Sequence, residues 1–212
     1  MQNSIAFPAQ SKSLVFALKK NVRKNKAHEV RVNSGRLRGR KLAFPDAEGL
    51  RPTLGRTRET LFNWLRPNLV DARCLDLFAG SGVLGIEAAS IGAREVVLIE
   101  NQPQTATYLA ASIDSLGLQD ICTLHTTGAS DYLAQCSQPF DIVFLDPPFA
   151  ATALLEQAIA LVCQRGLVRQ HIYLEFDQQQ ESAVAALLST FELSPSKTTK
   201  AGSTRSWLIS AC

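Results

Sequence analysis

Residues 141–149 read D-I-V-F-L-D-P-P-F, a short apolar run that two prolines bring to an end. The β-branched and aromatic residues of 141–145 predict a buried strand. Pro147 fixes its own φ and favours an extended Asp146, and neither Pro147 nor Pro148 has an N–H group. The strand therefore delivers a carboxylate, a backbone carbonyl and the Phe149 ring to one place, which suits binding a planar amine. The alternative is a proline-terminated strand with a core phenylalanine.

The composition indicates one large domain, or one domain with an extension. The chain has 212 residues, of which 46% are hydrophobic and 7% aromatic, enough to bury a core. No apolar run approaches the ~18 residues that a membrane-spanning helix needs. The five cysteines are scattered and lack CxxC spacing, which favours reduced core residues in a cytosolic protein over a disulfide framework or a zinc site.

The charge is divided unevenly along the chain. Residues 1–66 carry 15 lysines and arginines against four acids, whereas the whole chain carries 22 against 19. A basic arm on a mildly acidic body favours a polyanionic partner. We expect three parts: a flexible basic tail over 1–28, a hairpin and helix extension over 29–66, and a body over 67–212.

The extension is predicted to present basic side chains to a phosphate backbone. Val30 and Val32 begin a strand, residues 33–35 form a turn, and residues 36–42 return as a second strand. A helix follows from Thr53 to about Leu65, as a substrate-side lid, a packing helix or both. The candidate residues for binding a nucleic-acid phosphate backbone are Arg36, Arg38, Arg40, Lys41, Arg51 and Arg58.

The body opens with a strand, a glycine turn and an apolar helix. Residues 74–78 lead into Ala79-Gly80-Ser81-Gly82, and a helix is expected over 83–91. Glycines allow close backbone approach to a ligand, and the turn fits G-x-G-x-x-G, a weak signal alone. Glu100 ends the next strand, 20 positions after Gly80, where an acid commonly binds a ribose diol. An adenosine-type cofactor is therefore expected, either NAD or S-adenosylmethionine.

Strands and helices continue to alternate to the end of the chain. We expect helices over 103–116, 154–163 and 181–188, and strands over 121–125, 172–175, 191–193 and 207–210, with residues 194–206 as a polar connection. This order predicts an α/β fold with a mostly parallel sheet, helices on both faces and one antiparallel strand. Glu175 is interpreted as a strand-end acid, with the alternative that it borders the site.

Five stretches together resemble one family of enzymes. They are RVNSGRLRGRKL (31–42), RPTLGRTRETLFNWL (51–65), DLFAGSGVLGIEA (76–88), IE (99–100) and DIVFLDPPF (141–149). The chain resembles the bacterial 16S ribosomal RNA guanine-N2 methyltransferases of RsmD type, within the class I S-adenosylmethionine-dependent methyltransferases. This resemblance implies a Rossmann-like seven-stranded fold, a cytoplasmic monomer, no metal, and the 30S subunit or its 16S RNA as partner.

The resemblance also implies roles for individual residues. Asp146, Pro147, Pro148 and Phe149 would bind and stack on the target guanine, with Asp146 stabilising the charge that grows on nitrogen. The cofactor-binding residues would be Asp76, Phe78, Ala79, Gly80, Gly82, Glu100, Gly128 and Ala129. Three departures from the family pattern concern the cofactor or lid: Gly55 after RPT, Gly128 near the adenine ring, and Asn101-Gln102 after Glu100.

Other function classes remain open from the residues. DPPF is shared with DNA adenine methylases, so a DNA or other RNA amino-methyltransferase is the nearest alternative. A non-catalytic RNA-binding assembly factor and an NAD-dependent oxidoreductase are further alternatives, although DPPF has no evident role in hydride transfer. The choice of guanine N2 depends on the resemblance through residues 31–65.

Overall fold

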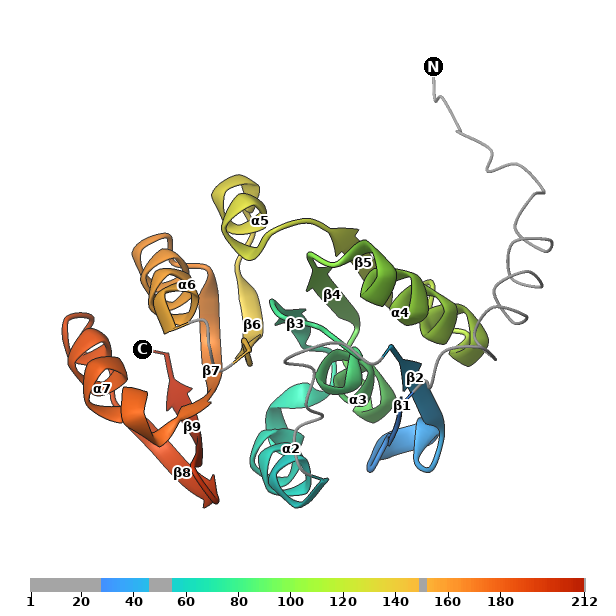
Figure 1. The fold of residues 1–212 in the computed structure, drawn as a ribbon, viewed down its shortest axis with the longest axis horizontal. Helices are drawn as coiled ribbons and strands as arrows, with labels where there is room; N and C mark the ends of the chain where they lie inside the picture. Colours follow the sequence, from blue (N-terminus) through green and yellow to red (C-terminus); the bar gives the residue numbers. More distant parts are fainter. Residues whose placement is uncertain (1–27, 46–54, 149–151, 212) are drawn as a thin grey trace.

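A seven-stranded sheet in the order β5-β4-β3-β6-β7-β9-β8 forms the centre of the protein (Figure 1). The structure is a computed structural model and describes residues 28–45, 55–148 and 152–211. The strands are β3 (Arg73–Asp76), β4 (Glu95–Glu100), β5 (Cys122–Thr126), β6 (Phe140–Leu145), β7 (Val168–Asp177), β8 (Pro195–Ala201) and β9 (Thr204–Ser210). Strands β3 to β7 are mutually parallel, and β9 runs antiparallel to both β7 and β8. The predicted α/β class with one antiparallel strand is confirmed.

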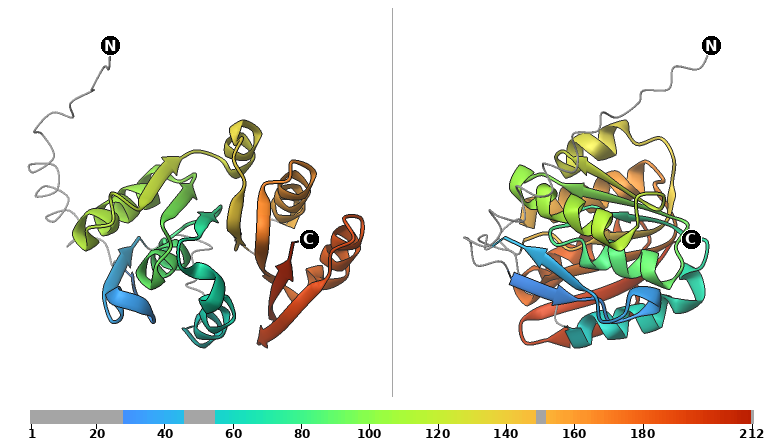
Figure 2. Two further views of the ribbon diagram at one scale, coloured as in Figure 1. Left: turned by 180° about the vertical axis from the view of Figure 1, so that it is seen from behind. Right: turned by 90° about the vertical axis from the view of Figure 1, so that its right-hand side faces the viewer.

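Helices cover both faces of the sheet (Figures 1 and 2). One face carries α2 (Gly55–Leu69), α3 (Val83–Ile91) and α4 (Pro103–Leu116), and the other carries α5 (Ala129–Gln135), α6 (Thr152–Gln164) and α7 (Glu181–Ser189). The central strands β4 and β6 are apolar on both sides because both of their faces are buried. Two hydrophobic cores result, one on each face.

The N-terminal hairpin packs against α3 and α4 on the first of these faces. It consists of β1 (His28–Arg31), a short 3-10 helix η1 (Gly35–Leu37) and β2 (Lys41–Phe44). The predicted hairpin is therefore present, but its return strand begins at Lys41 and not at Arg36. Residues 35–37 instead form the single helical turn that contacts α3.

Side chains of α3 hold the hairpin through its backbone. The Asn33 N–H donates to Glu87 Oε1 at 2.8 Å, and the Leu37 N–H donates to Ser90 Oγ at 2.8 Å. The Ser90 hydroxyl in turn donates to the Ser34 carbonyl at 2.7 Å. The helix that follows the hairpin, α2, continues past Pro67 to Leu69, so the expected division after residue 66 falls inside a helix.

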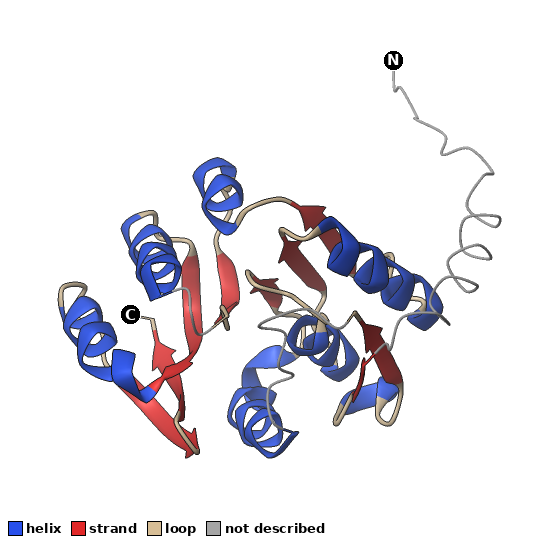
Figure 3. Cartoon of the chain, in the orientation of Figure 1, coloured by secondary structure: helices blue, strands red, loops and turns tan. Residues whose placement is uncertain are grey.

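The C-terminal segment differs most from the expectation. The predicted strand over 191–193 is the turn that ends α7, where the N–H groups of Phe191 and Leu193 both donate to the Leu188 carbonyl. The polar stretch expected as a connection contains β8, the outermost strand at one edge of the sheet (Figure 3). Most side chains of β8 are exposed or half-buried, so no apolar alternation marks it as a strand.

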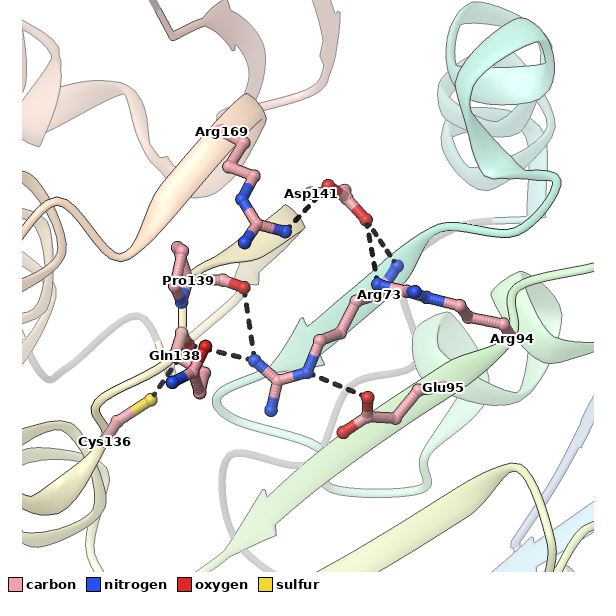
Figure 4. A network of polar contacts seen from close by, with 8 residues as sticks. All are labelled: Arg73, Arg94, Glu95, Cys136, Gln138, Pro139, Asp141 and Arg169. Carbon is pink, nitrogen blue, oxygen red and sulfur yellow. Dashed lines mark hydrogen bonds and ion pairs between the residues drawn. The ribbon is translucent and has the colours of Figure 1, made fainter.

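A polar network fastens the amino ends of the parallel strands (Figure 4). Asp141 of β6 accepts a hydrogen bond from the Arg73 N–H at 2.8 Å and lies 3.6 Å from Arg169 Nη1. The Arg73 side chain donates to Glu95 and to the carbonyls of Gln138 and Pro139. This edge is the one opposite to the DPP residues, which follow the carboxyl end of β6.

Candidate functional site at the carboxyl edge of the sheet

Three strands bring the candidate carboxylates to one edge of the sheet. Asp76 ends β3, Glu100 ends β4, and Asp146 directly follows β6. Because β3 lies between β4 and β6 and all three are parallel, their carboxyl ends adjoin. This edge is where ligands bind in open α/β sheets. Asp76, Glu100 and Asp146 therefore lie at the same edge of the sheet.

Asp76 is a buried carboxyl group that is only partly satisfied. It is 1% exposed, and its Oδ2 accepts a hydrogen bond from the Gly85 N–H at 3.0 Å. Its Oδ1 is buried and makes no hydrogen bond of good geometry within the described residues. Burial raises the pKa of Asp76 to about 7, against the lowering effect of the Gly85 N–H, and the charges of Asp146 and Glu100 add to the rise.

The glycine turn between β3 and α3 has a backbone that only glycine accommodates at Gly82. Its φ is +74°, and an added Cβ would lie 2.2 Å from Leu109 Cδ1. The turn is closed by a hydrogen bond from the Gly82 N–H to the Ala79 carbonyl at 2.6 Å. Ala79 itself is tied to β4 through the Ile99 carbonyl at 2.9 Å. Phe78 is half-buried at the start of this turn.

Glu100 is connected to the glycine turn through its carboxylate. Its Oε2 accepts from the Gly80 N–H at 2.9 Å, and its Oε1 accepts from the Gln102 N–H at 2.7 Å. Each carboxylate oxygen has a second lone pair, so Glu100 can still accept hydrogen bonds from a ligand diol. Glu100 thus fixes the glycine turn and the start of α4 relative to one another.

Gly128 and Ala129 stand at the start of α5, beside the end of β4. The Thr127 N–H donates to the Glu100 carbonyl at 3.2 Å, which holds this loop against the site. Gly128 is the N-cap of α5 and supplies no side-chain cap. An added Cβ at Gly128 would lie 3.1 Å from Asp131 Oδ2, so the Asp131 carboxylate occupies the adjacent space.

The proline pair after β6 places Asp146 at the mouth of the site. Asp146 is half-buried, Pro147 is buried and Pro148 is exposed. Phe149, the predicted stacking ring, lies outside the described residues, as does Arg51. Asp146 acts electrostatically on both Asp76 and Glu175, whose pKa values its negative charge raises.

Four of the candidate RNA-binding side chains are exposed on the hairpin: Arg36, Arg38, Arg40 and Lys41. Lys41 lies 2.6 Å from Glu29, and Arg40 donates to the Ser115 carbonyl at 3.4 Å. Of the remaining exposed pair, Arg36 lies within the turn that contacts α3, and Arg38 directly follows it. These positions agree with a basic surface on the hairpin.

The prediction for Arg58 is wrong, because this side chain is buried. It is 3% exposed, donates to the Arg31 carbonyl at 3.0 Å and lies 3.7 Å from Glu87 Oε2. Glu87 is fully buried and also accepts from the Asn33 N–H. Arg58 therefore joins α2 to the hairpin and α3, and it cannot reach RNA from this position.

Two acids, Glu87 and Glu175, are buried and make hydrogen bonds that the sequence did not indicate. Glu87 is the single charged residue of the otherwise apolar helix α3, a pattern that could have revealed its buried role. Glu175 of β7 is 6% exposed and accepts from the Tyr173 hydroxyl at 2.7 Å. Within the described residues, no group of histidine, cysteine or acidic side chains is arranged to bind a metal ion.

Comparison with known proteins identifies the family. The family model described as "Conserved hypothetical protein 95" matches residues 30–209. The chain belongs to this family. Ribosomal RNA small subunit methyltransferase D of Escherichia coli is 40% identical over 165 residues, which are 78% of this chain and 82% of that protein. The RsmD-type relationship that the sequence motifs suggested is confirmed.

Solved structures agree with this family assignment and with the fold. The Escherichia coli protein yhhF is 39% identical and superposes with a TM-score of 0.77, covering 86% of this chain and 98% of its own. Magnesium protoporphyrin IX methyltransferase from Synechocystis, solved with bound S-adenosylmethionine, has a TM-score of 0.62 over 74% of this chain and 79% of its own. At 19% identity this second likeness shows the class I methyltransferase fold alone.

Proposed function

We propose that this protein transfers a methyl group from S-adenosylmethionine to the exocyclic N2 amine of a guanine in 16S ribosomal RNA. The observation that carries the proposal is the adjacency of Asp146-Pro147-Pro148 to the glycine turn and Glu100 at one edge of the sheet. The name of the Escherichia coli relative supports ribosomal RNA of the small subunit as the substrate class. We further propose a cytoplasmic monomer that acts on the 30S subunit or a late assembly intermediate.

The residues at this edge fit S-adenosylmethionine. Asp76 Oδ1 is a buried acceptor without a hydrogen bond of good geometry, and a cationic amino group would satisfy it. Glu100 has lone pairs for a ribose diol beside the Gly80 N–H. Bound there, the cofactor supplies an activated methyl group on a sulfonium, so the protein needs no strong base to start the reaction.

The chain's own residues then orient the amine and stabilise its charge. Asp146 and the Pro147 carbonyl would accept hydrogen bonds from the two amine hydrogens, which aims the nitrogen lone pair along the direction of attack. As the new N–C bond forms and the S–C bond breaks, positive charge grows on N2, and the Asp146 carboxylate stabilises it. The amine then loses one proton, for which Asp146 is the nearest proposed acceptor.

The hairpin would hold the RNA on the face of the sheet that carries α3 and α4. Arg36, Arg38, Arg40 and Lys41 are exposed and can neutralise backbone phosphates without reading sequence. Selection of one guanine would then depend on the pocket that receives the flipped base. The turn of the hairpin packs on Ser90 near the C-terminal end of α3, whereas the glycine turn precedes the N-terminal end of that helix, so the bound RNA would extend along α3 to reach the site.

The experiment that tests this function uses 30S subunits that lack the modification and radiolabelled S-adenosylmethionine. We expect the wild type to produce N2-methylguanosine in 16S RNA, identified by mass spectrometry of nucleosides. Asp146→Asn should lower the rate by ~10²- to 10³-fold, since it removes the stabilising charge, with cofactor affinity largely unchanged. Asp120→Asn, an exposed acid on the loop before β5, is the matched control.

Each alternative function predicts a different result when duplex DNA is offered as substrate or NAD as cofactor beside this experiment. Methylated adenine in duplex DNA would favour the DNA amino-methyltransferase. Binding of 30S subunits with no methyl transfer would favour a non-catalytic assembly factor, and binding of NAD in place of S-adenosylmethionine would favour an oxidoreductase. Wild-type activity in Asp146→Asn would refute the role assigned to this residue.

A further inference from the structure

Glu175 lies next to Asp146 on the same face of the sheet. Strands β6 and β7 are parallel, with Phe144 opposite Tyr173 and Leu145 opposite Leu174. The next residue along each strand is Asp146 on one side and Glu175 on the other. Side chains alternate along a strand, so Asp146 and Glu175 share the face of Phe144 and Tyr173, whose rings lie 6.4 Å apart.

Among the described residues, the groups around Glu175 are hydroxyl groups and a carboxylate. Tyr173, which is fully buried, donates its hydroxyl to Glu175 Oε2 at 2.7 Å. Ser206 of β9 stands opposite Glu175 in the ladder and is 1% exposed. Within the part of the chain that the structure describes, no lysine, arginine or histidine forms an ion pair with Glu175.

The other charged groups that the structure describes near this face do not neutralise Glu175. Asp76 of β3 is a further acid on this edge, and it interacts electrostatically with Asp146. Helix α2, which packs over Phe144 through Phe62, has its buried cation Arg58 beside Glu87. Burial and, after it, the charge of Asp146 together raise the pKa of Glu175 to about 8, against the lowering effect of the hydrogen bond from the Tyr173 hydroxyl. A buried acid without a cation favours its neutral form.

We propose that Glu175 is a positioning residue that holds a proton and thereby keeps the pocket around Asp146 at a single negative charge. This inference rests on the proposed function, which gives Asp146 its role toward the amine. Of two adjacent carboxyls, the more deeply buried one retains the proton, and half-buried Asp146 stays ionised. Asp146 is then the carboxylate left to stabilise the amine and to accept its proton. If Glu175 and Asp146 were both ionised, the repulsion between them would displace Asp146.

The first test measures protonation without any activity. A carboxyl whose pKa rises on folding contributes stability below its ordinary pKa, and this stability is lost as pH rises through the folded-state value. The melting temperature of the wild type should therefore fall relative to that of Glu175→Gln between pH 5 and pH 9. Glu192→Gln, an exposed acid, is the control and should show a constant difference. A constant difference for Glu175→Gln would overturn the proposal.

The second test measures methyl transfer to 30S subunits across the same range. Glutamine mimics the protonated acid, so Glu175→Gln should keep at least about half of the wild-type rate at pH 7. The wild-type rate should decline above about pH 8, and the variant should not show this decline. A ~100-fold loss in Glu175→Gln at pH 7, or an unchanged alkaline decline, would overturn the proposal. If the wild type transfers no methyl group, the proposed function fails, and the melting curves alone decide the protonation of Glu175.

Discussion

Asp76 shows how one buried carboxyl can couple cofactor binding to pH. Its folded-state pKa of about 7 is raised mainly by burial, so below pH 7 it is mostly neutral. A cationic cofactor group would require the ionised form, because only that form forms an ion pair. Between pH 6 and pH 8 the ionised fraction changes about tenfold.

We therefore expect the affinity of the wild type for S-adenosylmethionine to rise about tenfold from pH 6 to pH 8. Calorimetric titration at several pH values measures this dependence. Asp76→Asn should bind more weakly and show little change over the same range. An affinity of the wild type that is constant across pH 7 would contradict an ion pair at Asp76.

For single residues, the sequence predicted the place along a strand or helix better than the burial and contacts of the side chain. Glu100 and the DPP residues are each predicted at the end of a strand, and a mostly parallel sheet brings such strand ends to one edge. That β3 ends at Asp76 is seen only in the structure. The burial of Arg58 could not be predicted from its own neighbours in the chain. It depends on Glu87, 29 positions later, and on the Arg31 carbonyl of the hairpin, which meet only after packing.

At the level of elements, the contact between η1 and α3 depends on one glycine. Gly35 has a φ of +75°, and an added Cβ would lie 2.1 Å from the Ser90 carbonyl oxygen. Gly39, in the same hairpin, has a φ of +84°, but an added Cβ would meet nothing within 4 Å. The two glycines share the same conformational demand and differ in the space around them.

This pair gives a matched comparison. Gly39→Ala should cost about 1 kcal/mol, which is the strain of a left-handed alanine. Gly35→Ala should cost a further ~1–3 kcal/mol, because the hairpin must move off α3 to relieve the overlap. Chemical denaturation measures both values, and proteolysis of the hairpin reports its detachment. Equal costs for the two variants would argue against tight docking of the hairpin.

The elements that sequence analysis located best are those with apolar patterns. The helix over 83–91 was predicted with the same bounds that the structure shows, since a glycine turn and an apolar run define it. Strand β8 was missed because it pairs only with β9, lies at an edge and has polar side chains. The prediction of a strand over 191–193 is wrong, because Glu192 has a φ of +58° and the chain turns there after α7.

At the level of the whole molecule, exposed arginines lie in two separate places. The exposed arginines of the hairpin are candidates for RNA backbone contacts, whereas Arg94 and Arg169 lie about half-exposed at the amino edge of the sheet (Figure 4). That edge is opposite to the proposed site. Two sets of exposed arginines with different expected roles are therefore present on one protein.

We expect the double variant Arg36→Ala, Arg38→Ala to bind 30S subunits more weakly and with a smaller dependence on salt. Each lost phosphate contact should lower the slope of log affinity against log salt by about 0.7 to 0.9. Arg94→Ala with Arg169→Ala should leave the slope unchanged. Filter binding at several salt concentrations measures the slopes. Equal slopes in both double variants would contradict an RNA surface on the hairpin.

Within the described residues, no helix has the length and apolar content needed to cross a lipid bilayer.

The proposed monomer is consistent with the side chains of the edge strand β8. An exposed strand edge presents unpaired backbone groups to any similar strand that it meets. Strand β8 begins at Pro195, lacks one N–H donor there, and carries the exposed cations Lys197 and Lys200.

These features of β8 oppose its addition to a second sheet. Two copies that approached edge to edge would place the lysines of both copies along the shared ladder, and the repulsion between their ammonium groups would oppose a continuous intermolecular sheet. The polar side chains of β8, which give the sequence no strand pattern there, thus oppose fibril growth from this edge. At the high protein concentration of a cell, such protection keeps this edge from nucleating aggregates.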